Sequence, residues 1–543
     1  MPGFERRGRR VLPAHPRLLE IDTRSWLARL SGRAGRRVKL ADVADLDLDE
    51  QLAPGFDLVW LMGVWERGSA GRRVARGLPW MRAERERLLP DGSIKDIGGS
   101  PFAIAGYQVA EELGGDDGLA VLRHRLAARG VGLVLDFVPN HTALDHPWVR
   151  RHPERYVQGT EAQRIERPEA YLETRTNGRR WIAHGRDPYF PPWTDTAQLD
   201  YRHPEVHEAM RDALAQVATR CDGVRCDMAM LVLDDVFRAT WSDHPPAGAP
   251  DVPTGEFWWE AIRAVRRVYP AFLFMAEAYW DTEWRLQQLG FDHTYDKRLL
   301  DRLVAGDAAG VVAHLRADEA YQRASVRFLE NHDEPRAATR FAGDRLRVAL
   351  LTAAAVQGML MLQEGEVDGA RIRPPVQLVR RPEEPVDPEA AAIHREILGV
   401  TRQPPFPSGI CMAVEARTAW PGNETHERVL ARLWVGDRGV FRLVVVNLAD
   451  SPSQAYLPLA IPALAGRRVR LEDLIGPDGY DREGDDLLAR GLYVDLPADA
   501  AHVFRFEDVD AGAAEAWQIE PRDVETPERS RPAEAQRRAR RPA

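Results

Sequence analysis

The chain has few cysteines and no long apolar segment. Cys221, Cys226 and Cys411 are the only cysteines. Three cysteines cannot build a disulfide framework, and their spacing does not match a zinc site. We therefore expect them to be small buried side chains in a protein of the reducing cytoplasm. No apolar run approaches the roughly 20 residues that span a bilayer, so we expect no membrane segment.

An excess of positive charge is also missing. The formal net charge is -9, which argues against a nucleic-acid partner, because phosphate contacts require a basic surface. Four arginines lie within the first ten residues, but no apolar segment follows them, so we predict no secretory signal. No glycine-rich phosphate turn follows the first long apolar run at 55–63, which disfavours an open nucleotide-binding sheet.

Alternating strands and helices fill most of the chain. At 44% hydrophobic and 29% charged residues, the composition is that of an ordinary globular protein with more than one domain. Segments predicted as strands lie at 18–21, 55–63, 131–138, 221–227, 271–276, 290–295, 325–329 and 359–362. Helical spacing falls between them at 42–53, 116–129, 204–219, 257–268, 282–289, 297–315 and 345–356. This α/β alternation predicts a (β/α)8 TIM barrel, with an open doubly wound sheet as the alternative.

Changes of pattern along the chain predict the domain boundaries. We expect a basic N-terminal arm at 1–14 and the barrel at 15–405. An insert of irregular structure should follow the third strand, at about 142–200, because proline, tryptophan and charges recur there without a period. Short strands separated by Gly, Pro and Asp predict a C-terminal antiparallel β-sandwich at 406–508. Residues 509–543 have almost no large apolar side chains and are expected to form a disordered tail.

The segment 221–230 combines a short strand with two opposite charges. Arg225 and Asp227 are two residues apart, so in a strand they project from the same face. A guanidinium beside a carboxylate lowers the pKa of the acid, and an ionised carboxylate at a strand end could attack the anomeric carbon of a sugar. A buried structural ion pair would have the same sequence and is an equally good explanation of this segment alone.

Polar clusters follow four of the predicted strands. They are Asp136–His141, Arg225 with Asp227, Glu277, and Asn331–Asp333. In a TIM barrel the carboxyl ends of the strands converge on one site, so three acids from separate strands could meet there. Two carboxylates roughly 5–5.5 Å apart would support glycosidic cleavage with retention. For any single acid, a surface or helix-capping carboxylate is the simpler explanation.

Taken in order, these four motifs resemble glycoside hydrolase family 13, the α-amylase family. The resemblance covers residues 15–400, and the sandwich that follows also suits the family. It implies that Asp227 is the nucleophile, Glu277 the general acid/base and Asp333 the third carboxylate, which holds the distorted sugar. Arg225 would keep Asp227 ionised. The resemblance further implies that His141 and His332 contact the reacting sugar. Asp136 would position these sugar-binding side chains.

Three positions depart from the family pattern. Many α-amylases carry Lys-His where this chain has Met230 and Leu231, so their acceptor-side sugar contacts are in doubt. The tyrosine that stacks under the reacting sugar in many relatives is replaced by Phe102, and Tyr107 is an alternative stacking platform. Asn140 is often a calcium ligand in the family. It is the one metal ligand that we predict, with calcium as an optional ligand and no required cofactor.

We therefore expect a cytoplasmic, retaining α-glycosidase that acts on α-linked glucosides or α-glucan oligosaccharides through a covalent glycosyl-enzyme. A transglycosylase or isomerase of the same family is the first alternative, because hydrolysis and transfer share this intermediate. A non-catalytic carbohydrate-binding or partner protein is the second, although all three acids are present. The sequence leaves substrate linkage and oligomeric state open.

Overall fold

The computed structural model describes residues 12–175, 178–244 and 255–509. Within them the chain divides into two compact units, with a boundary between Ser408 and Gly409 and with residues 448–450 in the first unit. Most of the predicted N-terminal arm, and all but the first residue of the predicted tail, lie outside the described residues. None of the described helices is long and apolar enough to cross a membrane.

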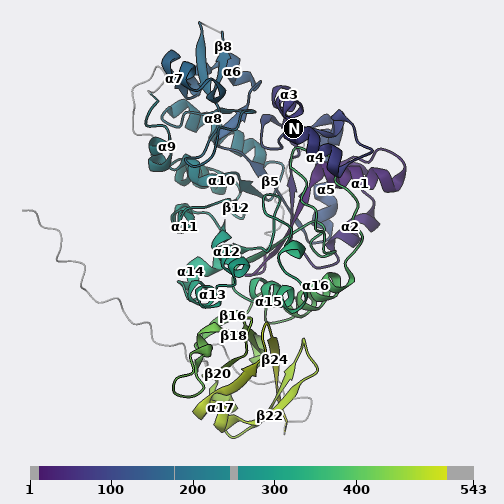
Figure 1. Cartoon of the computed structure of the whole chain (residues 1–543), viewed down its shortest axis with the longest axis vertical. Coiled ribbons are helices and arrows are strands. Elements are labelled where there is room, and N and C mark those ends of the chain that lie inside the picture. The colour runs from purple at the N-terminus through teal and green to yellow at the C-terminus, as the bar shows by residue number, and fades with distance from the viewer. Residues whose placement is uncertain (1–11, 176–177, 245–254, 510–543) are drawn as a thin grey trace, which may run out of the picture. The chain divides into compact units, whose positions relative to one another are not determined.

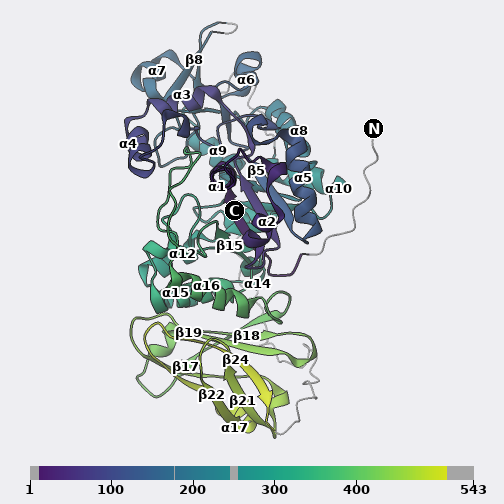
Figure 2. The ribbon, with the colours of Figure 1, turned by 90° about the vertical axis from the view of Figure 1, so that its right-hand side faces the viewer.

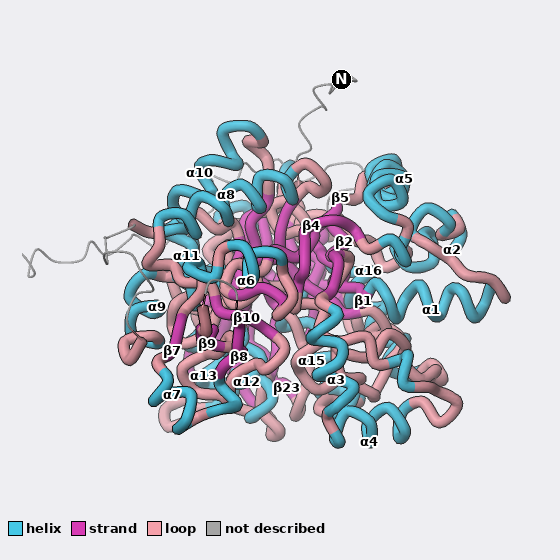
Figure 3. The backbone as a smooth tube through the Cα atoms, turned by 90° about the horizontal axis from the view of Figure 1, so that it is seen from above, coloured by secondary structure: helices cyan, strands magenta, loops and turns pink. Residues whose placement is uncertain are grey.

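The first unit contains a closed parallel barrel of eight strands, which confirms the predicted fold class. Figure 3 looks onto this barrel from above and shows the helices around its strands. In the order in which neighbours pair, the strands are β1 (Arg17–Asp22), β15 (Met359–Gln363), β14 (Ser325–Arg327), β13 (His293–Tyr295), β12 (Leu273–Ala276), β11 (Gly223–Cys226), β5 (Gly132–Phe137) and β2 (Leu58–Met62). Every pairing in the ring is parallel, including that of β1 with β2 and with β15.

Helices connect successive barrel strands, as expected for parallel neighbours. They are α1 (Thr23–Ala34), α2 (Asp45–Leu52), α5 (Gly115–Ala128), α8 (Pro204–Ala218), α9 (Asp234–Thr240), α10 (Phe257–Val268), α11 (Glu283–Leu289), α12 (Lys297–Ala305), α13 (Ala308–His314), α14 (Glu319–Arg323) and α15 (Gly343–Ala354). A further helix, α16 (Pro388–Thr401), follows the last barrel strand. Local signals set several of their ends. The side chain of Asp22 accepts from the N–H groups of Arg24 and Ser25 in the first turn of α1, and Pro388 follows the capping Asp387 of α16.

Two stretches of the barrel unit lie outside the strand–helix alternation, and the second of them was predicted differently. The polar segment after β2 forms β3 (Trp65–Arg67), α3 (Ser69–Gly77) and α4 (Pro79–Leu88), and it returns through β4 (Ile104–Val109), which pairs with β3. The insert after β5 is not irregular. It contains α6 (Pro147–Arg151), α7 (Glu161–Glu166), a sheet of β7 (Gln158–Gly159), β9 (Arg180–Ala183) and β8 (Tyr171–Thr174), and a pair of β6 (His141–Ala143) with β10 (Thr196–Gln198). These elements lie together in Figure 1.

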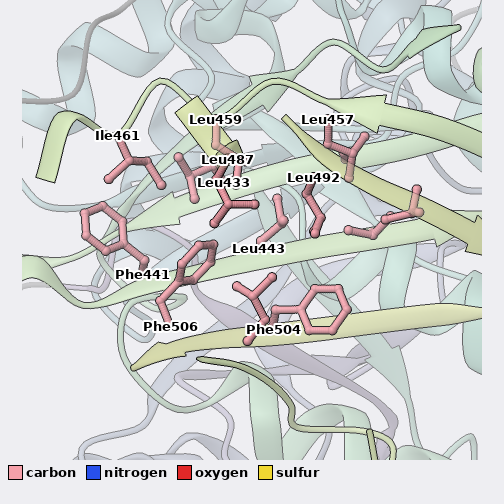
Figure 4. Packing of buried hydrophobic residues seen from close by; sticks show 14 of the residues in the cluster. Leu433, Phe441, Leu443, Leu457, Leu459, Ile461, Leu487, Leu492, Phe504 and Phe506 are labelled. Atoms are coloured by element: carbon pink, nitrogen blue, oxygen red, sulfur yellow. The ribbon is translucent and has the colours of Figure 1, made fainter. Parts of the chain in front are cut away.

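The second unit is an antiparallel β-sandwich, also as predicted. One sheet has the order β16 (Ile410–Val414), β18 (Val429–Val435), β19 (Phe441–Asn447), β24 (Ala501–Asp508), β21 (Arg468–Asp473) and β22 (Gly479–Glu483). The other has the order β17 (Arg417–Thr418), β20 (Ser453–Leu457) and β23 (Leu492–Leu496), with α17 (Gly484–Arg490) before its last strand. Figure 2 shows these strands edge on, and Figure 4 shows the leucines and phenylalanines that fill the space between the sheets.

Candidate active site

The site lies at the carboxyl ends of the barrel strands, where the sequence places its polar clusters. β11 ends at Cys226 and β12 at Ala276, and these strands pair in register, with Cys226 opposite Ala276. Asp227 and Glu277 are therefore the first residues beyond two neighbouring strands. The N–H of Glu277 donates to the carbonyl of Cys226, which fixes the two acids side by side.

Arg225 contacts both of these acids. Its Nη1 donates to Oδ1 of Asp227 at 2.6 Å, and its Nη2 lies 2.7 Å from Oε2 of Glu277. The guanidinium is fully buried and packs over the rings of Trp60 and Phe102, each with the centroid 5.1 Å from the guanidinium carbon. A planar guanidinium presents its N–H groups in a fixed fork, so one side chain sets the mutual position of two carboxylates.

Glu277 has further partners that hold its carboxylate in place. Oε2 accepts from the N–H of Met228 at 2.7 Å, and Oε1 accepts from the hydroxyl of Tyr279 at 2.9 Å. Burial raises the pKa of Glu277. Arg225 opposes this effect, whereas the charges of Asp227 and Asp333 add to it. The net upward direction is the one that a general acid requires.

The expected low pKa of Asp227 is wrong. Burial raises the pKa of this carboxyl, and the charge and hydrogen bond of Arg225 lower it by less, so the net shift is upward. The sequence argument considered the arginine but not the removal of the carboxylate from water, which disfavours its charged form. Asp227 and Glu277 therefore compete for protons beside a single shared cation.

Asp333 completes the group of acids from the loop after β14. Its side chain is 52% exposed, and its Oδ2 lies 3.1 Å from Nε2 of His332. Burial alone would raise the pKa of Asp333, but the charge and hydrogen bond of His332, with Arg225 and Arg373, lower it to about 2. The guanidinium of Arg373 also donates to the backbone carbonyl of Asp333. This acid is thus ionised and faces the open side of the site.

The other predicted binding residues surround these acids. Asp136 accepts from Nε1 of Trp60 at 2.9 Å and from the N–H of Gly63 at 2.6 Å; burial raises its pKa to about 6. His141 is buried, which lowers its pKa to about 4, and its ring lies against Trp193 with centroids 5.3 Å apart. His141 is therefore neutral at pH 7 and can exchange hydrogen bonds with a neutral ligand.

The two aromatic candidates differ in their surroundings. Phe102 is half-buried between Arg225 and His332, with its ring centroid 5.4 Å from that of the imidazole, so it forms part of the floor of the site. Tyr107 stacks on Phe137 with centroids 5.7 Å apart, and its hydroxyl both donates to the carbonyl and accepts from the N–H of Val138. One face of the Tyr107 ring is therefore covered by the protein.

The surroundings of Asn140 do not fit a calcium ion. Its Oδ1 accepts from Nε2 of Gln198 at 2.9 Å, and its Nδ2 donates to Oε1 of Gln198 at 3.2 Å. The same Nε2 group also lies 2.9 Å from the carbonyl of Asn140 and 3.1 Å from that of Leu199. An amide donor thus occupies the space among three oxygens that a cation would need. Within the described residues, no three His, Cys, Asp or Glu side chains form a metal-binding group.

Three side chains that contact the acids or their partners were not predicted as part of the site. Glu20 lies on β1 with Oε1 2.5 Å from Nδ1 of His332, Tyr279 donates to Glu277, and Tyr295 accepts from Nε of Arg225 at 3.4 Å. Glu20 had a signal in the sequence, because it interrupts the short apolar segment at 18–21. The two tyrosines had none, since tyrosine is common in barrel cores.

Comparison with known proteins agrees with this geometry. Residues 103–369 match the family described as "Alpha amylase, catalytic domain". Residues 103–369 are thus identified as a catalytic domain of the α-amylase family, glycoside hydrolase family 13. Alpha-amylase 3 of Dictyoglomus thermophilum is 23% identical over 273 residues, which are 47% of this chain and 50% of the relative. The alpha-1,4-glucan:maltose-1-phosphate maltosyltransferase of Rhodospirillum rubrum is 28% identical over 275 residues, covering 48% of this chain and 32% of the relative.

The chain spans half or less of the length of those two curated relatives. A solved structure matches a larger part of it. The noncanonic maltogenic alpha-amylase AmyB from Thermotoga neapolitana superposes with a TM-score of 0.62 at 19% identity, over 91% of this chain and 99% of that protein. At this identity the likeness concerns the fold.

Proposed function

We propose that this enzyme cleaves α-linked glucosides or α-glucan oligosaccharides with retention of the anomeric configuration. The observation that carries the proposal is the bridge that Arg225 makes between Asp227 and Glu277. Because both acids contact one guanidinium, their carboxylates lie close together, which favours the retaining separation of roughly 5–5.5 Å over the roughly 6.5–9.5 Å of inverting enzymes.

In the first step, Asp227 attacks the anomeric carbon and forms an ester bond to it. The glycosidic C–O bond breaks at the same time, and the leaving oxygen takes the proton of Glu277. Burial raises the pKa of Glu277, which favours the protonated form that supplies this proton. Asp333, ionised and open to the site, holds hydroxyls of the distorted ring.

In the second step, Glu277 acts as a base. It takes a proton from water or from a sugar hydroxyl, whose oxygen attacks the anomeric carbon as the ester bond to Asp227 breaks. Both carboxyls then return to their starting protonation states. The two inversions at the same carbon give net retention.

Transfer to a sugar acceptor is the second candidate. Met230 and Leu231, which stand where many α-amylases have Lys-His, are buried and offer no polar contact to an acceptor. Exposed aromatic rings lie nearby instead. Trp280 follows Glu277 by three residues, and its ring lies 5.0 Å, centroid to centroid, from that of Tyr189 of the insert. An apolar surface beside the acid/base favours a sugar acceptor over water.

The test is product analysis with a panel of α-linked disaccharides and maltooligosaccharides. Early NMR spectra should show the α-anomer released first, and chromatography should separate shorter sugars from longer or isomeric products. The Asp227→Asn variant should lose activity by at least about 10³-fold while keeping its Tm. Asp292→Asn, which removes a carboxylate paired with Arg266 just before β13, should remain active. A β-anomer as first product, or an active Asp227→Asn, would refute the mechanism.

We also propose a cytoplasmic location. The three cysteines, all within the described residues, are buried and form no disulfide. This state suits a reducing compartment.

A further inference from the structure

Glu20 is an acid buried inside a barrel strand. It lies on β1 between Leu19 and Ile21, has no exposed surface, and pairs in register with Trp60 of β2. Its Oε1 lies 2.5 Å from Nδ1 of His332, and its Oε2 has no hydrogen-bond partner among the described residues. A buried carboxylate is costly unless a partner supplies a proton or a charge, and His332 is the partner present.

The imidazole of His332 is held on every side. The Trp60 ring meets it edge-on with centroids 5.6 Å apart, and Phe102 lies 5.4 Å away. Its Nε2 lies 3.1 Å from Oδ2 of Asp333, whose side chain is 52% exposed and faces the open side of the site. This nitrogen is therefore held at the edge of the site, beside the carboxylate that meets the ligand.

The charges around His332 come from three elements. Glu20 belongs to β1, Asp227 follows β11, and Asp333 is the next residue in the loop after β14. Burial alone would lower the pKa of His332. Asp333 and Glu20, through charge and hydrogen bonds, outweigh burial and raise the pKa well above its usual value.

Glu20 determines which ring nitrogen of His332 keeps its proton when the imidazolium is deprotonated. If the imidazole lost one proton, the remaining N–H would stay on Nδ1, beside the Glu20 carboxylate. Nε2 would then carry a lone pair that faces the Asp333 carboxylate and cannot donate to a sugar hydroxyl. Only the doubly protonated ring both donates through Nε2 and neutralises part of the charge of Asp333.

We infer that Glu20 is a positioning residue of the active site: it holds His332 as an imidazolium whose Nε2–H group donates to a hydroxyl of the bound sugar. The inference rests on the proposed function for its substrate, but the state of His332 can be measured without any substrate. Loss of the imidazolium should then lower activity at alkaline pH, in addition to the loss caused by deprotonation of Glu277.

The first experiment is a histidine NMR titration of the full chain, with the His332 signals assigned by their absence in His332→Gln. In the wild type, His332 should stay doubly protonated through pH 8. In Glu20→Gln, the amide oxygen can still accept from Nδ1, but the negative charge is gone, so the pKa should fall by about one unit or more. Glu364→Gln is the matched control, because this buried acid pairs with Arg29 and Arg381. A neutral wild-type His332 at pH 7, or an unshifted pKa in Glu20→Gln, would overturn the inference.

The second experiment follows kcat/KM against pH on whichever α-glucoside the wild type cleaves. In Glu20→Gln the fall of activity on the alkaline side should begin at lower pH than in the wild type, with the activity below that pH largely kept. A merely structural role would instead lower activity equally at every pH, together with the Tm, and would refute the inference. If the wild type cleaves no α-glucoside, the proposed function fails, and the NMR titration alone decides the role of Glu20.

Discussion

The N–H of Met228 donates to Oε2 of Glu277 at 2.7 Å, so the residue directly after Asp227 helps to hold the second acid. Met228 makes this contact with φ 43° and ψ 49°, in the left-handed region that side chains other than glycine seldom adopt. Such a conformation costs roughly 1–2 kcal/mol in a residue with a Cβ atom. The fold therefore carries a local strain at the point where the two acids are tied together.

This strain predicts how Met228 tolerates substitution. Met228→Ala keeps the Cβ atom and serves as the reference. Relative to it, Met228→Gly should be more stable by about 0.5–1 kcal/mol, because glycine adopts positive φ readily. Met228→Ile should be less stable by about 1–2 kcal/mol and should lose activity, since a branched side chain pushes the N–H away from Glu277. Urea unfolding and kcat measurements check both; equal stability of the Gly and Ile variants would show that the turn is relaxed.

The role of Glu277 predicts a dependence on the leaving group. Glu277→Gln cannot donate a proton, yet its amide keeps the size of the side chain. Cleavage of oligosaccharides, whose leaving group needs a proton, should slow by about 10²–10⁴-fold, whereas release of an acidic nitrophenol should slow far less. Initial rates on matched nitrophenyl and sugar glycosides test this. A uniform loss on both substrates would mean that Glu277 does not act as the acid.

Much of the barrel could be predicted because its signals are local. The buried strand β2 and the helix α10 follow directly from an apolar run and from helical spacing. The helix expected at 297–315 is instead two helices, since Gly306 adopts φ 69° and ends α12. The insert was expected to be irregular because short strands in small sheets leave too few residues for a period to be seen.

The three acids could also be placed from the sequence, since parallel strands bring their carboxyl ends to one edge of the barrel. Their electrostatics could not. The pKa of Asp227 depends on burial and on the charges of Asp333 and His332, which lie more than 100 positions away, and neither enters a reading of Arg225 and Asp227 alone. For the same reason the sequence did not predict the contact between Glu20 and His332, which joins β1 to the loop after β14.

The amide pair of Asn140 and Gln198 predicts that the enzyme keeps its stability without calcium. A chelator should leave the wild-type Tm unchanged. In Gln198→Glu, a carboxylate replaces the amide donor beside the carbonyls of Asn140 and Leu199, which leaves a buried negative charge among oxygens. An unpaired buried charge costs about 3–5 kcal/mol, and calcium would offset it.

Thermal unfolding with chelator and with calcium measures this effect. The Tm of Gln198→Glu should fall in chelator and recover in calcium, whereas Gln198→Leu, which has no carboxylate, should show no response to calcium. A wild-type Tm that falls in chelator would show that a metal contributes to the native fold despite the amide pair.

The aromatic pair beside Glu277 predicts where an acceptor binds. Tyr189 is 69% and Trp280 is 37% exposed, and Trp280 and Asp281 both have positive φ, 62° and 63°. A strained loop thus holds an apolar ring at the surface, three residues from the acid/base, where it can stack on a sugar. Removing such a stacking surface costs about 0.5–1.5 kcal/mol. Trp280→Ala should therefore lower the ratio of transfer to hydrolysis by about 2- to 10-fold.

Trp284→Ala provides the matched control for this prediction, because Trp284 is 44% exposed but packs against Tyr321 on α14. Its ratio of transfer to hydrolysis should equal that of the wild type. Tyr189→Ala should resemble Trp280→Ala, since each ring supports the other, and the double variant should add little to either single change. The ratio is obtained by product chromatography at several acceptor concentrations. If all three single variants behaved alike, these rings would not contact the acceptor, and water and sugar would reach the glycosyl-enzyme without their help.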